Sequence, residues 1–161
     1  SGMTWTVLQP GGFMEITFSQ IAGWDMEKGK VRVVGSGRTP RAVISLYDVA
    51  EFAVTATHRP EMRDRSIPLG GPEALTVMDA VKVFEEATGQ KLKVAHVPVA
   101  VLKIASVVLR PFNPPLSTIL TFASSERPDV IDMAPVLSEF PVKLTSLREF
   151  AARSAGASHA R

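Results

Sequence analysis

The chain has 161 residues, of which 45% are hydrophobic, and a formal net charge of +2. This length and composition are typical of one globular domain that buries a core without a metal or disulfide. Lysine and arginine are scattered and never form a run, so no nucleic-acid partner is expected. The absence of cysteine excludes disulfides, thiolate nucleophiles and cysteine-ligated metals, and it agrees with a reducing compartment.

The sequence shows no recognisable signal peptide. Its longest apolar run, residues 97–109, contains Lys103 and is too short to span a bilayer. We therefore expect a cytoplasmic protein with no membrane partner. Within one domain of residues 1–161, we expect a tag remnant at 1–2, an α/β part at 3–97, a mostly helical part at 98–155 and a frayed tail at 156–161.

The first expected element is a strand at residues 4–8, which are rich in β-branched and aromatic side chains. The sequence Pro10-Gly11-Gly12 is expected to end this strand. Phe13 and Met14 follow just past its carboxyl end, where ligands collect in open α/β sheets. A helix over 14–22 and a polar connection over 24–30 are expected next.

Two short strands, 31–34 and 42–45, are expected to form a hairpin around the loop GSGRTP. Ser45 and Asp48 have the spacing of a capping box that starts a helix, and Pro60 is expected to end that helix.

The strand expected at residues 65–69 is joined to the first strand by a long crossover, which is typical of a parallel sheet. Thr76 and Asp79 repeat the capping-box spacing at the start of a helix that Gly89 ends. A strand over 92–97 and helices over 99–109, 116–123, 133–140 and 147–154 complete the chain, the last two capped by Asp132 and by Ser146 with Glu149.

The helix at 99–109 is apolar nearly all round, which is typical of a helix that is buried or faces a partner. The order of the elements predicts an α/β fold with a small partial Rossmann-type parallel sheet, flanking helices and a C-terminal helical subdomain.

Four segments resemble the carboxyl-terminal half of the NmrA-like proteins, atypical short-chain dehydrogenase/reductases that bind NAD or NADP. The segments are TWTVLQPGGFME, ISLYDVAEFAV, IPLGGPEALTVMDAVKVFEEATGQKLKVAHVP and FPVKLTSLREFA. They stand in the family's order and spacing between Trp5 and Ala151, with weak agreement over 23–40 and 109–132. The resemblance implies that this chain lacks the family's amino-terminal Rossmann half.

The family's cofactor half carries a Gly-rich turn that places the pyrophosphate at a helix N-terminus. The nearest candidate here, Gly35-Ser36-Gly37, lies in the expected hairpin, lacks a third glycine and opens no helix. Catalytic members of the superfamily use a Tyr with a Lys four positions later, but the only tyrosine, Tyr47, has Glu51 at that distance. The resemblance thus implies no catalytic residue here and no cofactor for this chain alone.

Pro10, Gly11, Gly12 and Phe13 match the family segment that lines the nicotinamide and substrate side of the cleft. They are the expected cofactor-binding residues if an amino-terminal half supplies NADP or NAD. Phe13 and Met14 are the expected contacts to a small apolar substrate. The alternative is an ordinary strand-to-helix turn with Phe13 in the core.

Other side chains favour structural roles. Asp48 matches the Asp of the family's D-V-A motif, and helix capping is its favoured role. His58 and His96 have no ligand partner at metal spacing, so no metal site is predicted. Lys103 is either a buried base or, more commonly for such a position, a lysine that reaches the surface.

An exposed strand edge and a bare apolar face favour a partner. We expect a homodimer, formed by strand pairing or by the helix at 99–109, or a separate Rossmann-half protein. Two functions follow: a non-catalytic NmrA-like remnant that is a dimeric small-molecule-binding or regulatory module, or the substrate-side half of an NAD(P)-dependent oxidoreductase. A chain with no function of its own is a third interpretation.

Overall fold

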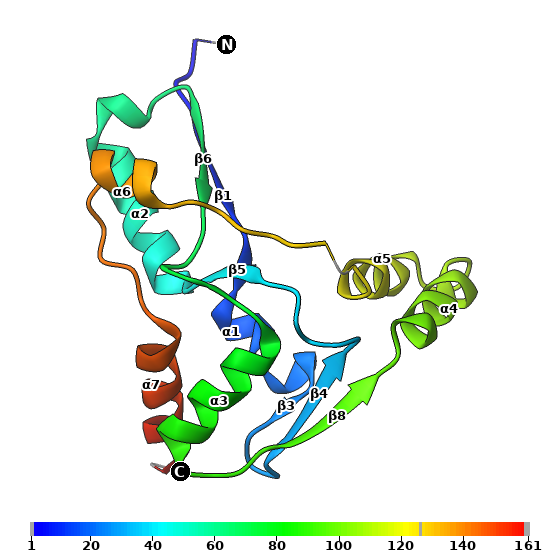
Figure 1. Cartoon of the computed structure of the whole chain (residues 1–161). Helices are drawn as coiled ribbons and strands as arrows, with labels where there is room; N and C mark the ends of the chain where they lie inside the picture. The colour runs from blue at the N-terminus through cyan, green and yellow to red at the C-terminus, as the bar shows by residue number, and fades with distance from the viewer. Residues whose placement is uncertain (1, 126, 160–161) are drawn as a thin grey trace.

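The computed structural model describes residues 2–125 and 127–159, with side chains described as far as residue 155. Short strands and helices alternate through the first two thirds, and helices dominate the last third (Figure 1). The fold is the predicted α/β arrangement with small parallel pairs of strands and flanking helices. The strands form three small groups, of two, three and three strands.

Strand β1 (Thr6–Pro10) runs parallel to β6 (Arg65–Leu69), as the crossover predicted. The expectation that Pro10-Gly11-Gly12 ends the first strand is confirmed, because β1 ends at Pro10 and Gly11 lies in no strand, although the chain stays extended beyond it. The amide of Gly11 donates to the carbonyl of Leu69 at 2.9 Å. The chain then continues as β2 (Gly12–Phe13), which pairs in parallel with β5 (Arg41–Ile44).

Pro10 has no N–H to donate, but it is compatible with this strand because its nitrogen points away from β6. Successive residues of a parallel strand direct their backbone groups to opposite neighbours. The carbonyl of Trp5 accepts from the amide of Asp64 just before β6, and the amide of Gly11 donates to β6. The nitrogen of Pro10 therefore faces away from β6, and its missing N–H removes no bond from the β1–β6 ladder.

The predicted hairpin of residues 31–34 and 42–45 is wrong. Strand β4 (Lys30–Val34) pairs in parallel with β8 (Lys93–Val97) and antiparallel with β3 (Trp24–Asp25). Strand β5 pairs with β2 and, antiparallel, with β7 (Ala74–Leu75). The two strands separate because their apolar side chains enter different cores.

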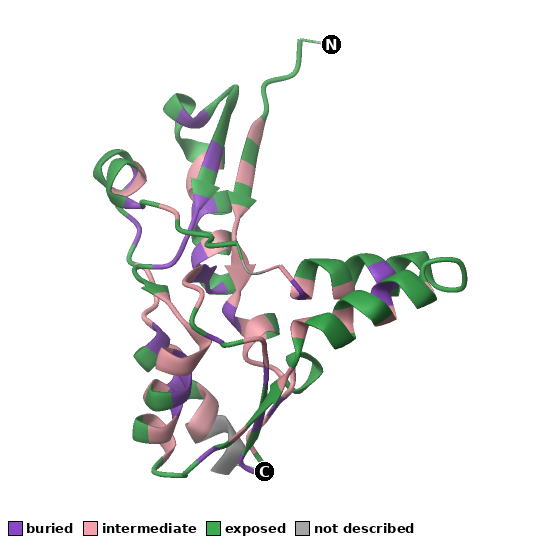
Figure 2. Cartoon of the chain, turned by 45° about the vertical axis from the view of Figure 1, so that its right-hand side comes forward, coloured by how far each residue is buried: buried purple, intermediate pink, exposed green. Residues whose placement is uncertain are grey.

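Two apolar clusters form the core of the body (Figure 2). In the first, the ring of Trp24 lies 5.0 Å from that of Phe18 and 5.1 Å from that of Phe84. Trp24 is only 4% exposed, so the expected polar connection at 24–30 is wrong at its first residue. The second cluster contains Ile44, Phe52, Met62, Ile67, Leu69, Met133, Phe140 and Val142.

The helix expected over 14–22 is interrupted. Helix α1 (Met14–Thr17) ends early, because the Ser19 hydroxyl donates to the carbonyl of Ile16 at 2.7 Å and so competes with helical bonding. The other helices are η1 (Gln20–Ala22), α2 (Leu46–His58), η2 (Pro60–Met62), α3 (Val77–Thr88), α4 (Val99–Leu109), α5 (Pro114–Ala123), α6 (Ala134–Glu139) and α7 (Leu147–His159).

Several helix ends have the predicted caps. The Thr76 hydroxyl accepts from the amide of Asp79 at 3.1 Å in a capping box before α3. Ser146 exchanges bonds with Glu149 before α7. Asp132 accepts from the amide of Ala134, but the N-cap position of α6 is Met133, so the prediction for Asp132 is one residue off. Of the expected frayed tail at 156–161, α7 includes residues 156–159, and residues 160–161 lie outside the described residues.

A buried carboxylate joins the two clusters. Asp48, in the first turn of α2, is 3% exposed and accepts from the amide of Thr145 at 2.8 Å and from its hydroxyl at 2.7 Å. Thr145 lies just before α7, which packs in the first cluster. The capping prediction is therefore correct for Ser45, which accepts from the amide of Tyr47, and wrong for Asp48.

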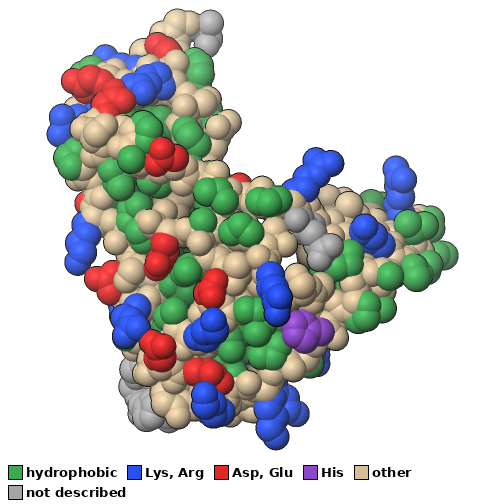
Figure 3. Space-filling model, viewed as in Figure 1, with side chains coloured by type: hydrophobic (Ala, Val, Ile, Leu, Met, Phe, Trp, Pro, Cys, Tyr) green, Lys and Arg blue, Asp and Glu red, His purple; other side chains and the backbone are tan. Residues whose placement is uncertain are grey.

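Helices α4 and α5 form a hairpin that projects from the body, and we call this hairpin the arm (Figures 1 and 3). Apolar side chains gather on its outer surface (Figure 3). Among the described residues, every helix falls short of the length and apolar character needed to cross a bilayer.

We predict that Asp48→Ala lowers the free energy of unfolding by about 2–3 kcal/mol, because it leaves the amide and hydroxyl of Thr145 without their acceptor. Glu51→Ala, which removes an exposed carboxylate from the same helix, should change it by less than about 0.5 kcal/mol. Equilibrium urea denaturation measures both. Equal effects of the two substitutions would contradict a linking role for Asp48.

Acid should weaken the fold through its helix caps. The hydrogen bond from the Thr76 side chain lowers the pKa of Asp79, and that from the Ser146 amide lowers the pKa of Glu149. A carboxylate with a lowered pKa stabilises the fold above its unfolded pKa, and this contribution is lost as pH falls through the folded pKa. The Tm should therefore fall between about pH 5 and pH 3, and it should fall less in Asp79→Asn/Glu149→Gln. An equal fall in both proteins would contradict this origin.

Candidate functional site

The carboxyl ends of three strand segments meet in the middle of the body. The continuous segment β1–β2 runs parallel to β6 and then to β5. In open α/β folds, ligands collect at this end of the strands. The predicted cofactor-binding residues Pro10, Gly11, Gly12 and Phe13 all lie here, beside the end of β5.

The glycines at this edge let backbone segments approach closely. A Cβ on Gly11 would lie 2.8 Å from the carbonyl oxygen of Ala42, and one on Gly71 would lie 2.0 Å from that of Val43. A Cβ on Gly12 would lie 3.3 Å from a methyl group of Val43 and 3.4 Å from the hydroxyl oxygen of Thr17, both side-chain atoms. Strand packing alone therefore explains why Gly11 and Gly71 lack side chains.

Phe13 and Met14, the predicted substrate contacts, both face the interior. Phe13 is partly buried and packs against the second cluster, and Met14 is only 1% exposed. Both placements agree with the alternative interpretation, a strand-to-helix turn with Phe13 at the core. A binding role for the residues from Pro10 to Met14 stays a prediction.

Glu15 is a residue of this edge that sequence reasoning missed. Its carboxylate accepts from the hydroxyl of Ser45 at 2.8 Å and from the amide of Leu46 at 3.0 Å. The charge lies at the N-terminus of α2, where the free amides carry partial positive charge. The two partners are 30 positions apart, so only the pairing of β2 with β5 brings them together.

The chain that returns from the arm passes the same edge. The carbonyl of Asp129 accepts from the amide of Ala42 at 2.5 Å, and Arg41 donates to the carbonyl of Ser125 at 2.5 Å. A Cβ on Gly11 would lie 3.6 Å from the carboxylate of Asp129. The base of the arm therefore adjoins the glycines of the candidate site.

The loop Gly35-Ser36-Gly37 is packed rather than open. A Cβ on Gly37 would lie 2.5 Å from a methyl group of Val33, and the carbonyl of Gly37 accepts from the amide of Met78 at 3.2 Å. The loop is therefore fastened to the start of α3. Its glycines, both with φ of 67°, serve a tight turn, and the loop offers no cradle for a phosphate.

The other polar candidates have local partners or face water. The Nδ1 atom of His96 lies 2.8 Å from the carbonyl of Gly35, and that of His58 lies 3.0 Å from the carbonyl of Val54. Lys103 is exposed, which agrees with the surface interpretation. The part of the chain that the structure describes has no group of three His, Asp or Glu side chains placed to hold a metal.

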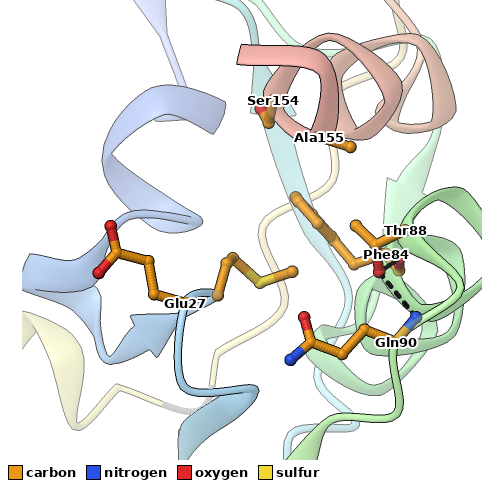
Figure 4. Close-up of a pocket in the computed structure, with 7 residues that line it drawn as sticks. Glu27, Phe84, Thr88, Gln90, Ser154 and Ala155 are labelled. Carbon is orange, nitrogen blue, oxygen red and sulfur yellow. Dashed lines mark hydrogen bonds between the residues drawn. The ribbon is translucent and has the colours of Figure 1, made fainter. Parts of the chain in front are cut away.

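A pocket of about 130 Å³ lies away from the strand ends (Figure 4). It is formed by the β3–β4 turn, the end of α3 and α7, and none of the predicted site residues lines it. Pockets that hold drug-sized ligands usually measure roughly 300–1,000 Å³, so this one is too small for a dinucleotide. Its lining residues are Met26, Glu27, Phe84, Thr88, Gln90, Ser154 and Ala155.

No family model matches the sequence. Among curated proteins, the photosystem II assembly factor Ycf39 of Synechocystis sp. is 28% identical over 158 residues, which cover 93% of this chain and 48% of that protein. An NAD(P)H azoreductase of Xenophilus azovorans is 31% identical over 96 residues, covering 58% of this chain and 32% of that protein. The chain spans about half the length of the first of these relatives and less of the second.

Solved structures show the same fold. An isoflavone reductase matches with a TM-score of 0.69 and 19% identity, covering 94% of this chain and 53% of that one. A leucoanthocyanidin reductase–NADPH complex from Vitis vinifera matches with a TM-score of 0.73 and 13% identity, covering 96% and 55%. The homologues thus include an NAD(P)H-dependent reductase, and the fold is that of Rossmann-like reductases.

We predict that alanine at the three glycines destabilises the chain in the order Gly71, Gly11, Gly12. Gly71→Ala and Gly11→Ala press a methyl group onto a carbonyl oxygen and should each cost about 1–3 kcal/mol or prevent folding. Gly12→Ala meets only side-chain atoms at less than 3.5 Å, those of Val43 and Thr17, which can shift, and should cost less than about 1 kcal/mol. Urea denaturation and soluble yield measure the order, and a larger loss at Gly12 than at Gly71 would contradict it.

Proposed function

We propose that this chain is the carboxyl-terminal, substrate-side half of an NAD(P)-dependent reductase fold. A dinucleotide-binding half, on the same polypeptide or on another, completes it. The open edge of β1 is the single observation that carries this proposal. Among the described residues, β1 pairs with β6 alone, whereas a strand inside a Rossmann-type sheet has a neighbour on both edges.

The open edge lies on the side of the body from which the arm projects (Figures 1 and 2). Trp5 is 50% exposed and Val7 is 43% exposed beside it. An unpaired parallel strand flanked by apolar side chains is a template for another strand. A dinucleotide-binding half that adds to β1 would therefore bring its cofactor beside the carboxyl end of β1 and the base of the arm.

The proposed ligand is a small apolar molecule held between that half and this chain. Phe13 is only partly buried, so part of its side chain remains accessible beside the strand ends. The arm adds exposed apolar side chains, and Asp129, in the chain that returns from the arm, lies close to Gly11. In this arrangement NADP or NAD supplies a hydride, and the residues from Pro10 to Phe13 shape the wall that the nicotinamide and ligand face.

A homodimer built on the same edge is the second candidate. Two copies of β1 could pair across their open edges, and such a dimer would act as a non-catalytic binding or regulatory module. The exposed apolar side chains of β1 support either partner. Sedimentation equilibrium separates the two, because only the second candidate predicts a stable dimer of the chain alone.

Amide exchange tests the open edge. By the alternation of a parallel strand, the amides of Val7 and Gln9 donate to β6, whereas those of Thr6 and Leu8 face the open edge. In the monomeric chain, Thr6 and Leu8 should exchange at least about tenfold faster than Val7 and Gln9. Slow exchange at all four amides in a monomer would contradict an open edge.

Titration with NADPH tests the function. The chain alone should show no saturable change in Tm up to millimolar NADPH, and the chain joined to a Gly-rich Rossmann half encoded upstream or beside it should bind NADPH and lose fast exchange at Thr6 and Leu8. A genome that encodes no such half, or saturable NADPH binding by the chain alone, would contradict the proposal.

A further inference from the structure

The arm buries two serines and exposes most of its large apolar side chains. Ser106 and Ser117 are each 7% exposed, and the Ser117 hydroxyl donates to the carbonyl of Ser106 at 2.7 Å between the two helices. Eight large apolar side chains of the arm are exposed, with exposed fractions between 39% and 83%, whereas Leu102, Leu109 and Leu120 are half-buried. The eight exposed residues are Val101, Ile104, Val107, Val108, Phe112, Leu116, Ile119 and Phe122.

This pattern departs from the one that water favours, in which most large apolar side chains lie between the helices and polar ones face the solvent. Small residues between helices, with serine hydroxyls bonded to backbone carbonyls and large apolar residues outside, are typical of helices in apolar surroundings. The arm is therefore suited to a hydrophobic medium rather than to water.

The exposed apolar side chains cover more than one face of the arm. At 100° per residue, Val101 and Val107 lie about 120° apart around α4. Phe112 lies in the turn between the helices and is 83% exposed. A protein half docked along β1 lies on one side of the arm, so it does not account for apolar side chains on several faces and at the tip.

The charge of the arm is of one sign. Residues 98–125 contain no aspartate or glutamate and two cations, Lys103 and Arg110, which are both exposed. A second copy of the arm would bring the same two positive charges. The complementary partner is an anionic surface that also accepts apolar side chains.

We propose that the arm binds the surface of an anionic lipid bilayer. Phe112 and the outer apolar side chains enter the boundary between headgroups and acyl chains, while Lys103 and Arg110 stay near the lipid phosphates. Helices α4 and α5 have 11 and 10 residues, and at about 1.5 Å per residue they reach roughly half of the ~30 Å hydrocarbon core. The arm thus inserts without spanning.

This inference is independent of the proposed reductase half, since it rests on the arm alone. It departs from the expectation that the chain has no membrane partner. That expectation rested on the absence of an apolar run long enough to span, and an inserting hairpin does not need one.

Vesicle flotation tests the proposal with the full chain. The chain should float with vesicles rich in phosphatidylglycerol about tenfold more than with phosphatidylcholine vesicles, and high salt should weaken the binding. Ile104→Asp/Ile119→Asp should abolish flotation. Val54→Asp is the matched control on α2, because Val54 is 61% exposed against 65% and 62% for the two isoleucines, and it should float as the parent does.

A second measurement locates the insertion. In Phe112→Trp, the added indole should be quenched by brominated lipids, whereas Trp5 and Trp24 of the parent chain should not. The proposal is overturned if the parent chain does not float with anionic vesicles, or if Val54→Asp lowers flotation as much as the arm substitutions. It is also overturned if the arm substitutions convert a dimer to a monomer without any vesicle binding, since the occupant is then a second copy.

Discussion

The packing of the body depends on two hydrogen bonds between Asp48 and Thr145. The two apolar clusters use different strands and different helices, and Asp48 in α2 is held by Thr145 at the start of the segment that enters α7. A buried carboxylate is costly unless it is hydrogen-bonded, so both donors of Thr145 are needed. Because these two hydrogen bonds connect α2, which packs in the second cluster, to the start of α7, which packs in the first, they couple the formation of the two clusters.

Two surfaces of the molecule are less well covered than these clusters. One edge of β1 is unpaired among the described residues, and the arm exposes most of its large apolar side chains. At Gly11 and Gly71, by contrast, neighbouring backbone already occupies the space that a side chain would take. The exposed apolar and unpaired surfaces therefore lie around the strand ends, and the strand ends themselves are well packed.

Local signals in the sequence predicted the helices well. The Thr76–Asp79 capping box, the apolar helix at 99–109 and the strand at 65–69 each depend on neighbours in sequence, and each is present. The resemblance to NAD(P)-binding reductases was likewise readable, because several motifs keep their order and spacing.

Long-range pairing could not be predicted in the same way. The hairpin prediction was wrong because β4 pairs with β8, about sixty residues later. The sequence of β4 alone does not indicate which strand it will pair with. Asp48 matched a capping pattern, but Thr145 lies 97 positions away. Glu15 was missed for the same reason, since its role exists only once β2 lies beside β5.

Pro10 also limits what can add to the open edge of β1. Along that edge, amide donors remain at Thr6 and Leu8, and Pro10 has none. An incoming strand therefore finds a short ladder with a defined end, which restricts its register. Long edges without such a stop are the ones that polymerise. The proline thus limits how far any second strand can pair along this edge of β1.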